Sequence, residues 1–293
     1  MRMVVTGAEG QVGREIVLMA RERKLAVVAL SRAQLDIGNP ESVSTAIASA
    51  TPDLIVNCAA FTDVDRSETE RVQAERGNRD GPAHVASAAA ASGALIVHLS
   101  TDFVFDGKSS HPYSEEAEPN PISYYGRTKL EGERLVMAAA GKHLVVRTSW
   151  IYGHGRRNFV TAIATQALEH KPVRVVSDQA GSPTYARDLA AAIFSLLEAG
   201  ARGIVNFGNA GECTRHEYAL EIVRLLGCAG EVGVEPIASE SLKQAAKRPA
   251  YSVLDCARYR RLTGLEPRPW QSALLDYLIQ EFPERFAAAA AAR

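Results

Sequence analysis

The sequence predicts an α/β protein built on a doubly wound parallel sheet. Short apolar runs alternate with helical patterns through the first half of the 293-residue chain. These runs are almost continuously apolar, which is typical of strands that helices cover on both faces. Because parallel strands joined by right-handed crossovers place helices on both sides of a sheet, this alternation indicates a doubly wound arrangement.

Capping residues and β-branched runs define the expected elements of the first half. Asn39 and Pro40 mark the start of one helix, and Gly93 marks the end of another. The expected strands are residues 3–5, 27–30, 54–57, 95–100 and 144–147, and the expected helices are residues 11–23, 40–50, 79–92 and 123–140.

The alternation weakens after about residue 150, which predicts a second, smaller domain. We expect residues 1–150 to form the larger domain, with some elements from about 173–200 returning to it. Residues 151–293 are expected to form mainly the smaller domain, beside the carboxyl edge of the sheet. Its expected elements are helices at 158–169, 186–198 and 216–226, and strands at 173–176 and 203–207.

Composition excludes several classes of function. With 33 Lys and Arg against 34 Asp and Glu, the net charge is −1, whereas nucleic-acid and anionic-membrane binders carry a basic excess. The four cysteines form no C-x-x-C pair, so neither a zinc site nor a disulfide framework is expected. No apolar run approaches the roughly 18 residues of a membrane span or resembles a signal peptide. We therefore expect a cytoplasmic protein without nucleic-acid or membrane partners.

A glycine-rich loop follows the first expected strand. In Thr6-Gly-Ala-Glu-Gly-Gln-Val-Gly13, Gly7 allows a tight turn, Gly10 lets a ligand approach the backbone, and Gly13 permits close packing of helix on strand. The following helix presents free N–H groups and a positive dipole to phosphates. Since the loop joins a strand to a helix, we interpret it as a dinucleotide-binding turn; an ordinary turn is the alternative.

The end of the second expected strand bears on the choice of cofactor. Leu30-Ser31-Arg32 contains no acidic residue for a ribose hydroxyl, whereas Arg32 and Ser31 could bind a 2′-phosphate. This favours NADPH, with NADH as the alternative if Arg32 is only a solvated cation. Nearby, Asp36 and Ile37 are expected to border the adenine.

A candidate proton donor begins the helix at 123–140. Tyr125 and Lys129 are at positions i and i+4 and share one helix face. An ammonium beside a phenol is expected to lower the pKa of the phenol, which would let Tyr125 exchange protons near neutral pH. Thr101 ends the fourth strand at the sheet edge where ligands bind, and could hydrogen-bond the same substrate oxygen. Tyr124 is the competing tyrosine, but its i, i+5 spacing to Lys129 takes it off that face.

These segments resemble the extended short-chain dehydrogenase/reductase superfamily, which has a Rossmann-like fold, and within it the dTDP-4-dehydrorhamnose reductases. The most particular matches are the strings His98-Leu-Ser-Thr-Asp-Phe-Val-Phe-Asp-Gly107, Arg147-Thr-Ser-Trp-Ile-Tyr152 and Asp178-Gln-Ala-Gly-Ser-Pro-Thr184. The resemblance implies NAD(P)H-dependent reduction of dTDP-4-dehydro-β-L-rhamnose to dTDP-β-L-rhamnose, the last step of dTDP-rhamnose synthesis.

The resemblance also implies roles for individual residues. The catalytic set would be Tyr125, Lys129 and Thr101. The cofactor set would be Gly7, Gly10, Gln11, Val12, Gly13, Ser31, Arg32, Asp36, Ile37, Ala59, Ala60, Thr62, Tyr125 and Lys129. The substrate set would be Thr101, Asp102, Phe103, Trp150 and Arg248, with Trp150 packing on the sugar ring and Arg248 meeting the nucleotide or forming a surface ion pair.

The chain departs from the family pattern at two places. Phe103 stands where the family often has tyrosine, which removes a hydroxyl from the sugar site. Some members bridge two subunits through magnesium; Glu15 could serve, but Arg187 stands where another acid would be expected, so we expect no essential metal. A homodimer is expected by analogy with the family.

Two other functions remain as alternatives. One is another nucleotide-sugar epimerase or reductase, although a dehydratase would show Glu in place of Phe103 and an epimerase would favour an acid near Arg32. The other is a non-catalytic regulatory subunit of the same fold, similar to the β subunit of methionine adenosyltransferase. Consumption of NADPH on addition of the keto sugar would separate these functions.

Overall fold

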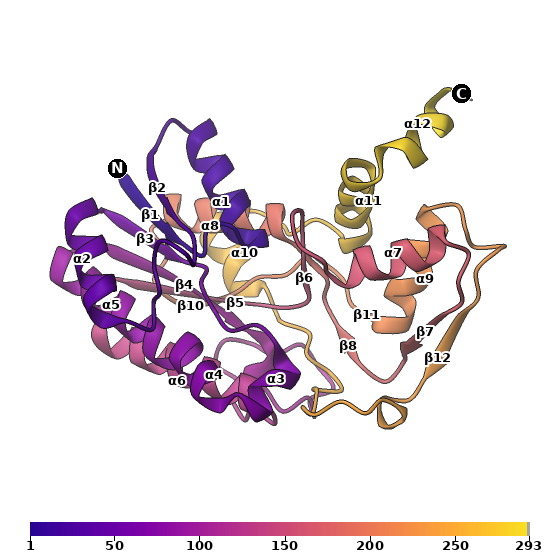
Figure 1. Ribbon diagram of the computed structural model, residues 1–293, viewed down its shortest axis with the longest axis horizontal. Helices are drawn as coiled ribbons and strands as arrows, with labels where there is room; N and C mark the ends of the chain where they lie inside the picture. Colours follow the sequence, from indigo (N-terminus) through magenta and orange to yellow (C-terminus); the bar gives the residue numbers. More distant parts are fainter. Residues whose placement is uncertain (292–293) are drawn as a thin grey trace.

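A six-stranded parallel sheet forms the larger part of the molecule, in the order β2-β1-β3-β4-β5-β10 (Figure 1). The computed structural model describes residues 1–291. Five of the six strands agree in position with those expected from apolar runs in the first half, and the sixth comes from the second half. The strands are β1 (Arg2–Thr6), β2 (Ala26–Leu30), β3 (Leu54–Asn57), β4 (Leu95–Thr101), β5 (His143–Thr148) and β10 (Gly203–Asn206).

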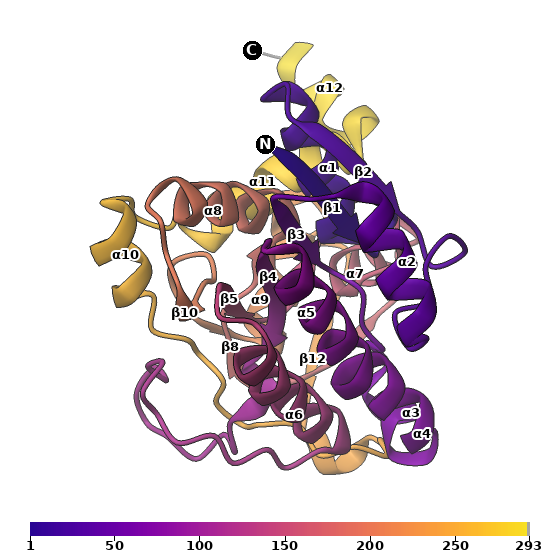
Figure 2. The ribbon, with the colours of Figure 1, turned by 90° about the vertical axis from the view of Figure 1, so that its left-hand side faces the viewer.

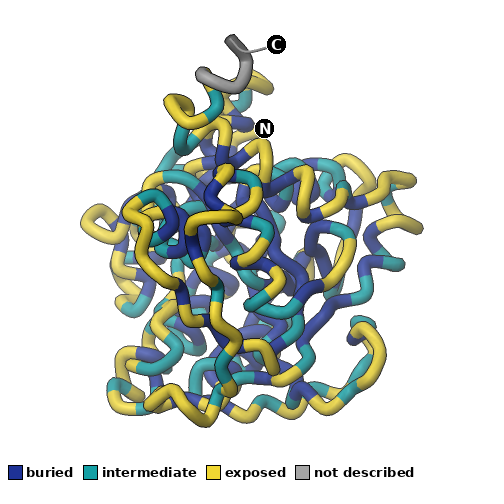
Figure 3. Tube along the Cα trace, turned by 90° about the vertical axis from the view of Figure 1, so that its right-hand side faces the viewer, coloured by how far each residue is buried: buried dark blue, intermediate teal, exposed yellow. Residues whose placement is uncertain are grey.

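Helices cover both faces of this sheet, so the predicted doubly wound, Rossmann-like fold is confirmed (Figure 2). Alternate side chains serve the two faces: Val5 and Val56 pack in one core, and Val4 and Ile55 in the other. Buried chain runs through the interior, with exposed residues around it (Figure 3). One face carries α1 (Gln11–Glu22) and α8 (Ala186–Glu198), and the other carries α2 (Pro40–Ala50), α5 (Gly81–Ser92) and α6 (Tyr124–Ala139).

Helical structure between β3 and β4 extends further than the sequence predicts. The expected helix at 79–92 is preceded by α3 (Val64–Thr69), α4 (Arg71–Glu75) and a five-residue π-helix, η1 (Arg76–Asp80). The charged composition of residues 63–80 lacks an apolar stripe, so periodicity gave no signal there.

The second half of the chain divides its elements between the two parts of the molecule. Helix α8 and strand β10 return to the main sheet, and α10 (Ala257–Thr263) packs beside them. Strand β7 (Val173–Val176), which lies inside the range expected to return, pairs instead with β12 (Val234–Ile237). The other elements are η2 (Asp102–Val104), β6 (Ile151–Tyr152), α7 (Phe159–Leu168), β8 (Ala180–Gly181), β9 (Thr184–Tyr185), β11 (Cys213–Thr214), α9 (Arg215–Leu225), η3 (Ser239–Ser241), α11 (Trp270–Glu281) and α12 (Pro283–Ala291).

A separate hydrophobic core holds the smaller part together. Helices α7, α9 and α11 enclose Tyr152, Tyr218, Trp270 and Tyr277, all of which are buried. The order of the main sheet reverses at β1, which lies between β2 and β3, and ligands bind at such reversals outside the carboxyl ends of the strands. The smaller core lies beyond this edge of the sheet (Figure 1). Within residues 1–291, no helix is long and apolar enough to cross a membrane.

A buried ion pair fixes α6 against the main sheet. Arg147 on β5 donates from Nε and Nη2 to the two carboxylate oxygens of Glu133 on α6, at 2.9 and 2.7 Å. The Arg147 side chain is 2% exposed and that of Glu133 is 0% exposed. Because two charges removed from water are tolerable only when paired, this bond sets the distance between helix and strand.

Replacing Glu133 by glutamine should leave the Arg147 guanidinium buried without a counter-charge. We expect the free energy of unfolding to fall by about 3–5 kcal/mol, the usual cost of breaking a buried pair. Urea denaturation of wild type and Glu133→Gln measures this difference. As a control, Glu70→Gln breaks the exposed pair with Arg66 and should cost less than about 1 kcal/mol. Equal effects of the two substitutions would contradict the structural role of Glu133.

Candidate active site

A cleft of about 1030 Å³ lies at the carboxyl edge of the main sheet, between the sheet and the smaller core. The glycine-rich loop and the start of α6 line it from one side, and residues of the second half line it from the other. Every site residue expected from the sequence lines this cleft except Ser31. These are Gly7, Gly10, Gln11, Val12, Gly13, Arg32, Asp36, Ile37, Ala59, Ala60, Thr62, Thr101, Asp102, Phe103, Tyr125, Lys129, Trp150 and Arg248.

The glycine loop leaves its backbone open to the cleft at one position only. Gly7 has φ +63°, and a Cβ there would lie 2.7 Å from the backbone nitrogen of Ala59. A Cβ on Gly13 would lie 2.3 Å from the carbonyl oxygen of Gly7, so this glycine serves helix packing. A Cβ on Gly10 would meet only that same oxygen, at 3.2 Å. Since Gly10 caps α1 and borders the cleft, the loop fits an anion held at a helix N-terminus.

The end of β2 brings only one of its two expected residues to the cleft. Arg32 is exposed and lines it, whereas Ser31 is buried and borders a smaller pocket beside α1. The expected contribution of Ser31 to a 2′-phosphate site is therefore not supported by this structure. Its backbone N–H donates to Oε1 of Gln34 at 2.9 Å, which turns the chain at this point. Asp36 forms an ion pair with Arg76, and both border the same part of the cleft.

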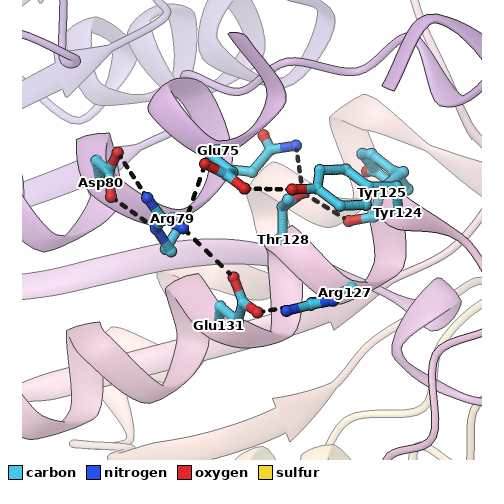
Figure 4. A network of polar contacts seen from close by, with 9 residues as sticks. Glu75, Arg79, Asp80, Tyr124, Tyr125, Arg127, Thr128 and Glu131 are labelled. Carbon is cyan, nitrogen blue, oxygen red and sulfur yellow. Dashed lines mark hydrogen bonds and ion pairs between the residues drawn. The ribbon is translucent and has the colours of Figure 1, made fainter. Parts of the chain in front are cut away.

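The two adjacent tyrosines of α6 face different surroundings. Tyr125 lines the cleft, edge-on to Phe103 with ring centroids 5.6 Å apart. The Tyr124 hydroxyl instead donates to Glu75 in a network that joins α6 to α4 and η1 (Figure 4). Arg79 lies in this network between Glu75 and Glu131, and Arg127 donates to Glu131 at 2.9 Å. The structure thus separates Tyr125, which borders the cleft, from Tyr124, which binds neighbouring helices.

The protonation of Tyr125 differs from the sequence expectation. Burial raises the pKa of Tyr125 to about 12, although a hydrogen bond with Thr101 opposes the rise. The expected lowering by Lys129 is wrong here: burial and the nearby charge of Asp102 raise the pKa, and Thr101 rather than Lys129 is the group that opposes the rise. Burial also lowers the pKa of Lys129 to about 8, and its Nζ donates to the carbonyl oxygen of Leu99 at 2.6 Å. Tyr125 therefore holds its proton at neutral pH.

Polar atoms without partners gather around Thr101. Thr101 Oγ1 donates to Oδ1 of Asp102 at 3.0 Å, but Oδ2 of Asp102 has no hydrogen-bond partner. The hydroxyls of Ser100 and Thr148 are also buried without partners, and all of these residues line the cleft. Because buried polar groups are normally hydrogen-bonded and these atoms border the cleft, they are available to a polar ligand there. Burial raises the pKa of Asp102 to about 6.

The far wall of the cleft holds two expected residues and one that the sequence analysis missed. The Arg248 guanidinium binds the Asp65 carboxylate at 2.7 Å, so the expected alternative of an ion pair is present, although it lies in the cleft. Trp150, whose φ is +47°, is covered by the guanidinium of Arg215, 3.6 Å from the ring centroid. Arg215 carried no motif signal, and only its position at the start of an amphipathic helix could have drawn attention to it.

Asn78 is a second residue that the sequence analysis missed. From the π-helix η1, its side chain binds the backbone N–H and carbonyl of Phe61 and the hydroxyl of Thr128 on α6. It therefore joins the loop after β3, which lines the cleft, to the helix that carries Tyr125. A π-helix has no simple sequence pattern, but it often occurs at functional sites.

The smaller pocket beside α1 contains Glu15. Burial raises the pKa of this carboxyl, and Arg187 and His154 oppose the rise.

No group of three or more His, Cys, Asp or Glu side chains that could hold a metal ion occurs within the part of the chain described.

Comparison with known proteins gives consistent matches over nearly the whole chain. The family model described as the RmlD substrate binding domain matches residues 1–282. The chain is 42% identical to dTDP-4-dehydrorhamnose reductase of Streptomyces griseus over 94% of this chain and 92% of that protein. It is 40% identical to a probable dTDP-4,6-dihydroxy-2-methyloxan-3-one 4-ketoreductase of Streptomyces antibioticus over 98% and 97%. The solved dTDP-4-dehydrorhamnose reductase of Bacillus anthracis in complex with NADP is similar with a TM-score of 0.91 and 35% identity, covering 95% of this chain and 99% of that one.

Gly126 tests the packing that places Tyr125 in the cleft. A Cβ at this position would lie 2.1 Å from the carbonyl oxygen of Phe103. We expect Gly126→Ala to lower the free energy of unfolding by about 1–3 kcal/mol through overpacking, although alanine favours helices. Chemical denaturation provides the measurement. Gly141→Ala is the control: that glycine has no atom within 4 Å of its built Cβ, so a change within about 0.5 kcal/mol is expected. A wild-type stability for Gly126→Ala would show that the contact is not tight.

Proposed function

Because the chain belongs to the RmlD substrate binding domain family, we propose that it reduces dTDP-4-dehydro-β-L-rhamnose to dTDP-β-L-rhamnose with NADPH. The observation that carries the proposal is the meeting of Tyr125, Lys129 and Thr101 in one cleft with the open glycine turn. The relatives named as dTDP-4-dehydrorhamnose reductases support the substrate class.

Tyr125 acts as the general acid in this proposal. Bound NADPH would supply a hydride to C4 of the sugar, which leaves negative charge on the former carbonyl oxygen. The phenol, whose pKa burial raises to about 12, is fully protonated at neutral pH and can donate to that oxygen. A charged Lys129 beside the cleft stabilises the phenolate that remains.

Thr101 and Asp102 orient the sugar. The Thr101 hydroxyl lies beside the phenol and can hydrogen-bond the same carbonyl oxygen. The unpartnered Oδ2 of Asp102 is suited to accept a hydrogen bond from a sugar hydroxyl. Phe103 offers only an apolar edge at this point, so Asp102 and the far wall of the cleft carry more of the sugar recognition.

The residues present fit a dinucleotide phosphate cofactor. The turn at Gly7, the open backbone at Gly10 and the N-terminus of α1 would hold the pyrophosphate. Arg32, exposed at the end of β2, is available for a 2′-phosphate, which supports NADPH over NADH. A homodimer and a cytoplasmic location complete the proposal.

Loss of absorbance from NADPH, followed after addition of a panel of dTDP-4-keto sugars, tests the reaction. We expect the wild-type protein to consume NADPH with the 4-keto-rhamnose substrate and more slowly with other keto sugars. Preferential turnover of another sugar would move the assignment to a related ketoreductase. Binding of cofactor without turnover of any sugar would favour the regulatory subunit.

In the same assay, Tyr125→Phe should reduce turnover by about 10²–10⁴-fold, because the proton donor is lost. Cofactor binding, measured by fluorescence titration, should persist. The neighbouring variant Tyr124→Phe removes the same atom outside the cleft and should keep turnover near the wild-type rate. Undiminished turnover in Tyr125→Phe would reject this residue as the acid.

The raised pKa of the Asp102 carboxyl predicts that the rate of reduction depends on pH. Since its pKa is raised to about 6, the carboxylate becomes neutral as the pH falls through that value. We expect kcat/KM to decline below about pH 6, because a neutral acid accepts a hydroxyl hydrogen bond less strongly. In Asp102→Asn the decline should disappear while kcat/KM at pH 8 is lower. A decline that persists in this variant would assign the titration to another group.

A further inference from the structure

Arg215 occupies a fixed position on the far wall of the cleft. It begins α9, and its backbone N–H donates to the carbonyl oxygen of Gln179 at 3.1 Å. The antiparallel pairing of β11 with β8 holds this segment beside Trp150. The guanidinium stacks 3.6 Å from the Trp150 ring centroid and 5.0 Å from that of Phe159. Stacking leaves the N–H groups at the guanidinium edge free to bind a ligand.

Arg215 differs from the other arginines that line the cleft. Three of them are neutralised: Arg76 pairs with Asp36, Arg174 with Glu235, and Arg248 with Asp65. The Arg215 guanidinium has no ion-pair partner and donates no hydrogen bond to any of residues 1–287. Arg32 and Arg156 also form no ion pair there, but they are exposed to water, whereas Arg215 is half-buried.

An unpaired guanidinium in such a place is costly unless a ligand compensates its charge. Burial lowers the pKa of Arg215 only to about 10, so the group stays charged at neutral pH. Asp102 is the carboxylate whose charge acts on it, and Arg248 acts in the opposite sense. Asp102 already accepts from Thr101, and its pairing with Arg215 is not direct. The N–H groups at the edge of the guanidinium are therefore available to an anionic acceptor in the cleft.

We propose that Arg215 binds the diphosphate of the nucleoside diphosphate-sugar and thereby selects diphosphate over monophosphate ligands. The inference rests on the proposed function, since it names a residue of the same site. The diphosphate is the anionic part of such a substrate, and a planar guanidinium binds two phosphate oxygens at once. Trp150 then serves as the platform that orients the guanidinium, and its stacked face is not free for the sugar ring.

Isothermal titration calorimetry on the protein loaded with NADP⁺ tests this role, with dTDP, dTMP and thymidine as probes. In Arg215→Met, which keeps an apolar stem on Trp150, we expect dTDP affinity to fall about 10- to 100-fold. Thymidine affinity should not change, so the preference for dTDP over dTMP should shrink. Arg215→Lys should restore part of the dTDP affinity. In turnover assays, KM should rise in Arg215→Met with little change in kcat.

Arg174→Met is the matched control, because that arginine also lines the cleft but is already paired with Glu235. It should leave dTDP affinity near the wild-type value. Unchanged dTDP binding in Arg215→Met would overturn the proposal, as would equal losses for dTDP and thymidine. A wild-type protein that binds NADPH but not dTDP would remove the proposed function itself. That outcome is distinct from a wild type that binds dTDP independently of Arg215.

Discussion

The ion pair between Arg147 and Glu133 determines where α6, the helix that carries Tyr125, lies. Both side chains are buried, so α6 cannot move along β5 without leaving a charge unpaired. Lys129 precedes Glu133 by one helical turn, and the same carboxylate favours its charged form. One carboxylate therefore both holds the helix and supports the ammonium in the cleft.

Glycines allow α6 to make close contacts with the elements beside it. A Cβ at Gly132 would lie 2.0 Å from the carbonyl oxygen of Asn78, and one at Gly126 would lie 2.1 Å from that of Phe103. Helix α6 thus packs directly on the backbone of η1 and of η2. Glycines also allow close packing on the side of the cleft formed by the glycine-rich loop. Gly7 lets this loop pack on Ala59, and Gly13 lets α1 pack on the loop itself. Both sides of the site depend on backbone contacts that a side chain would prevent.

Several buried polar atoms that line the cleft have no hydrogen-bond partner within the protein. The hydroxyls of Ser100 and Thr148 and one oxygen of Asp102 lack partners, and Arg215 faces them with a free guanidinium. Such groups destabilise a folded protein unless a ligand binds them. A keto sugar bearing hydroxyls and a diphosphate provides matching donors and acceptors for both kinds of group.

The sequence by itself determined the local features: the strand positions, the turn at Gly7, the i, i+4 relation of Tyr125 and Lys129, and the family resemblance. These follow from periodicity, backbone freedom and helix geometry, which act over a few residues. Tertiary structure alone decided which groups are buried and what they meet. It raised the pKa of Tyr125 against expectation, turned Ser31 away from the cleft, and brought Arg215 onto Trp150 from 65 positions along the chain. Desolvation and long-range contacts depend on how distant segments pack together. Short sequence patterns do not specify this packing.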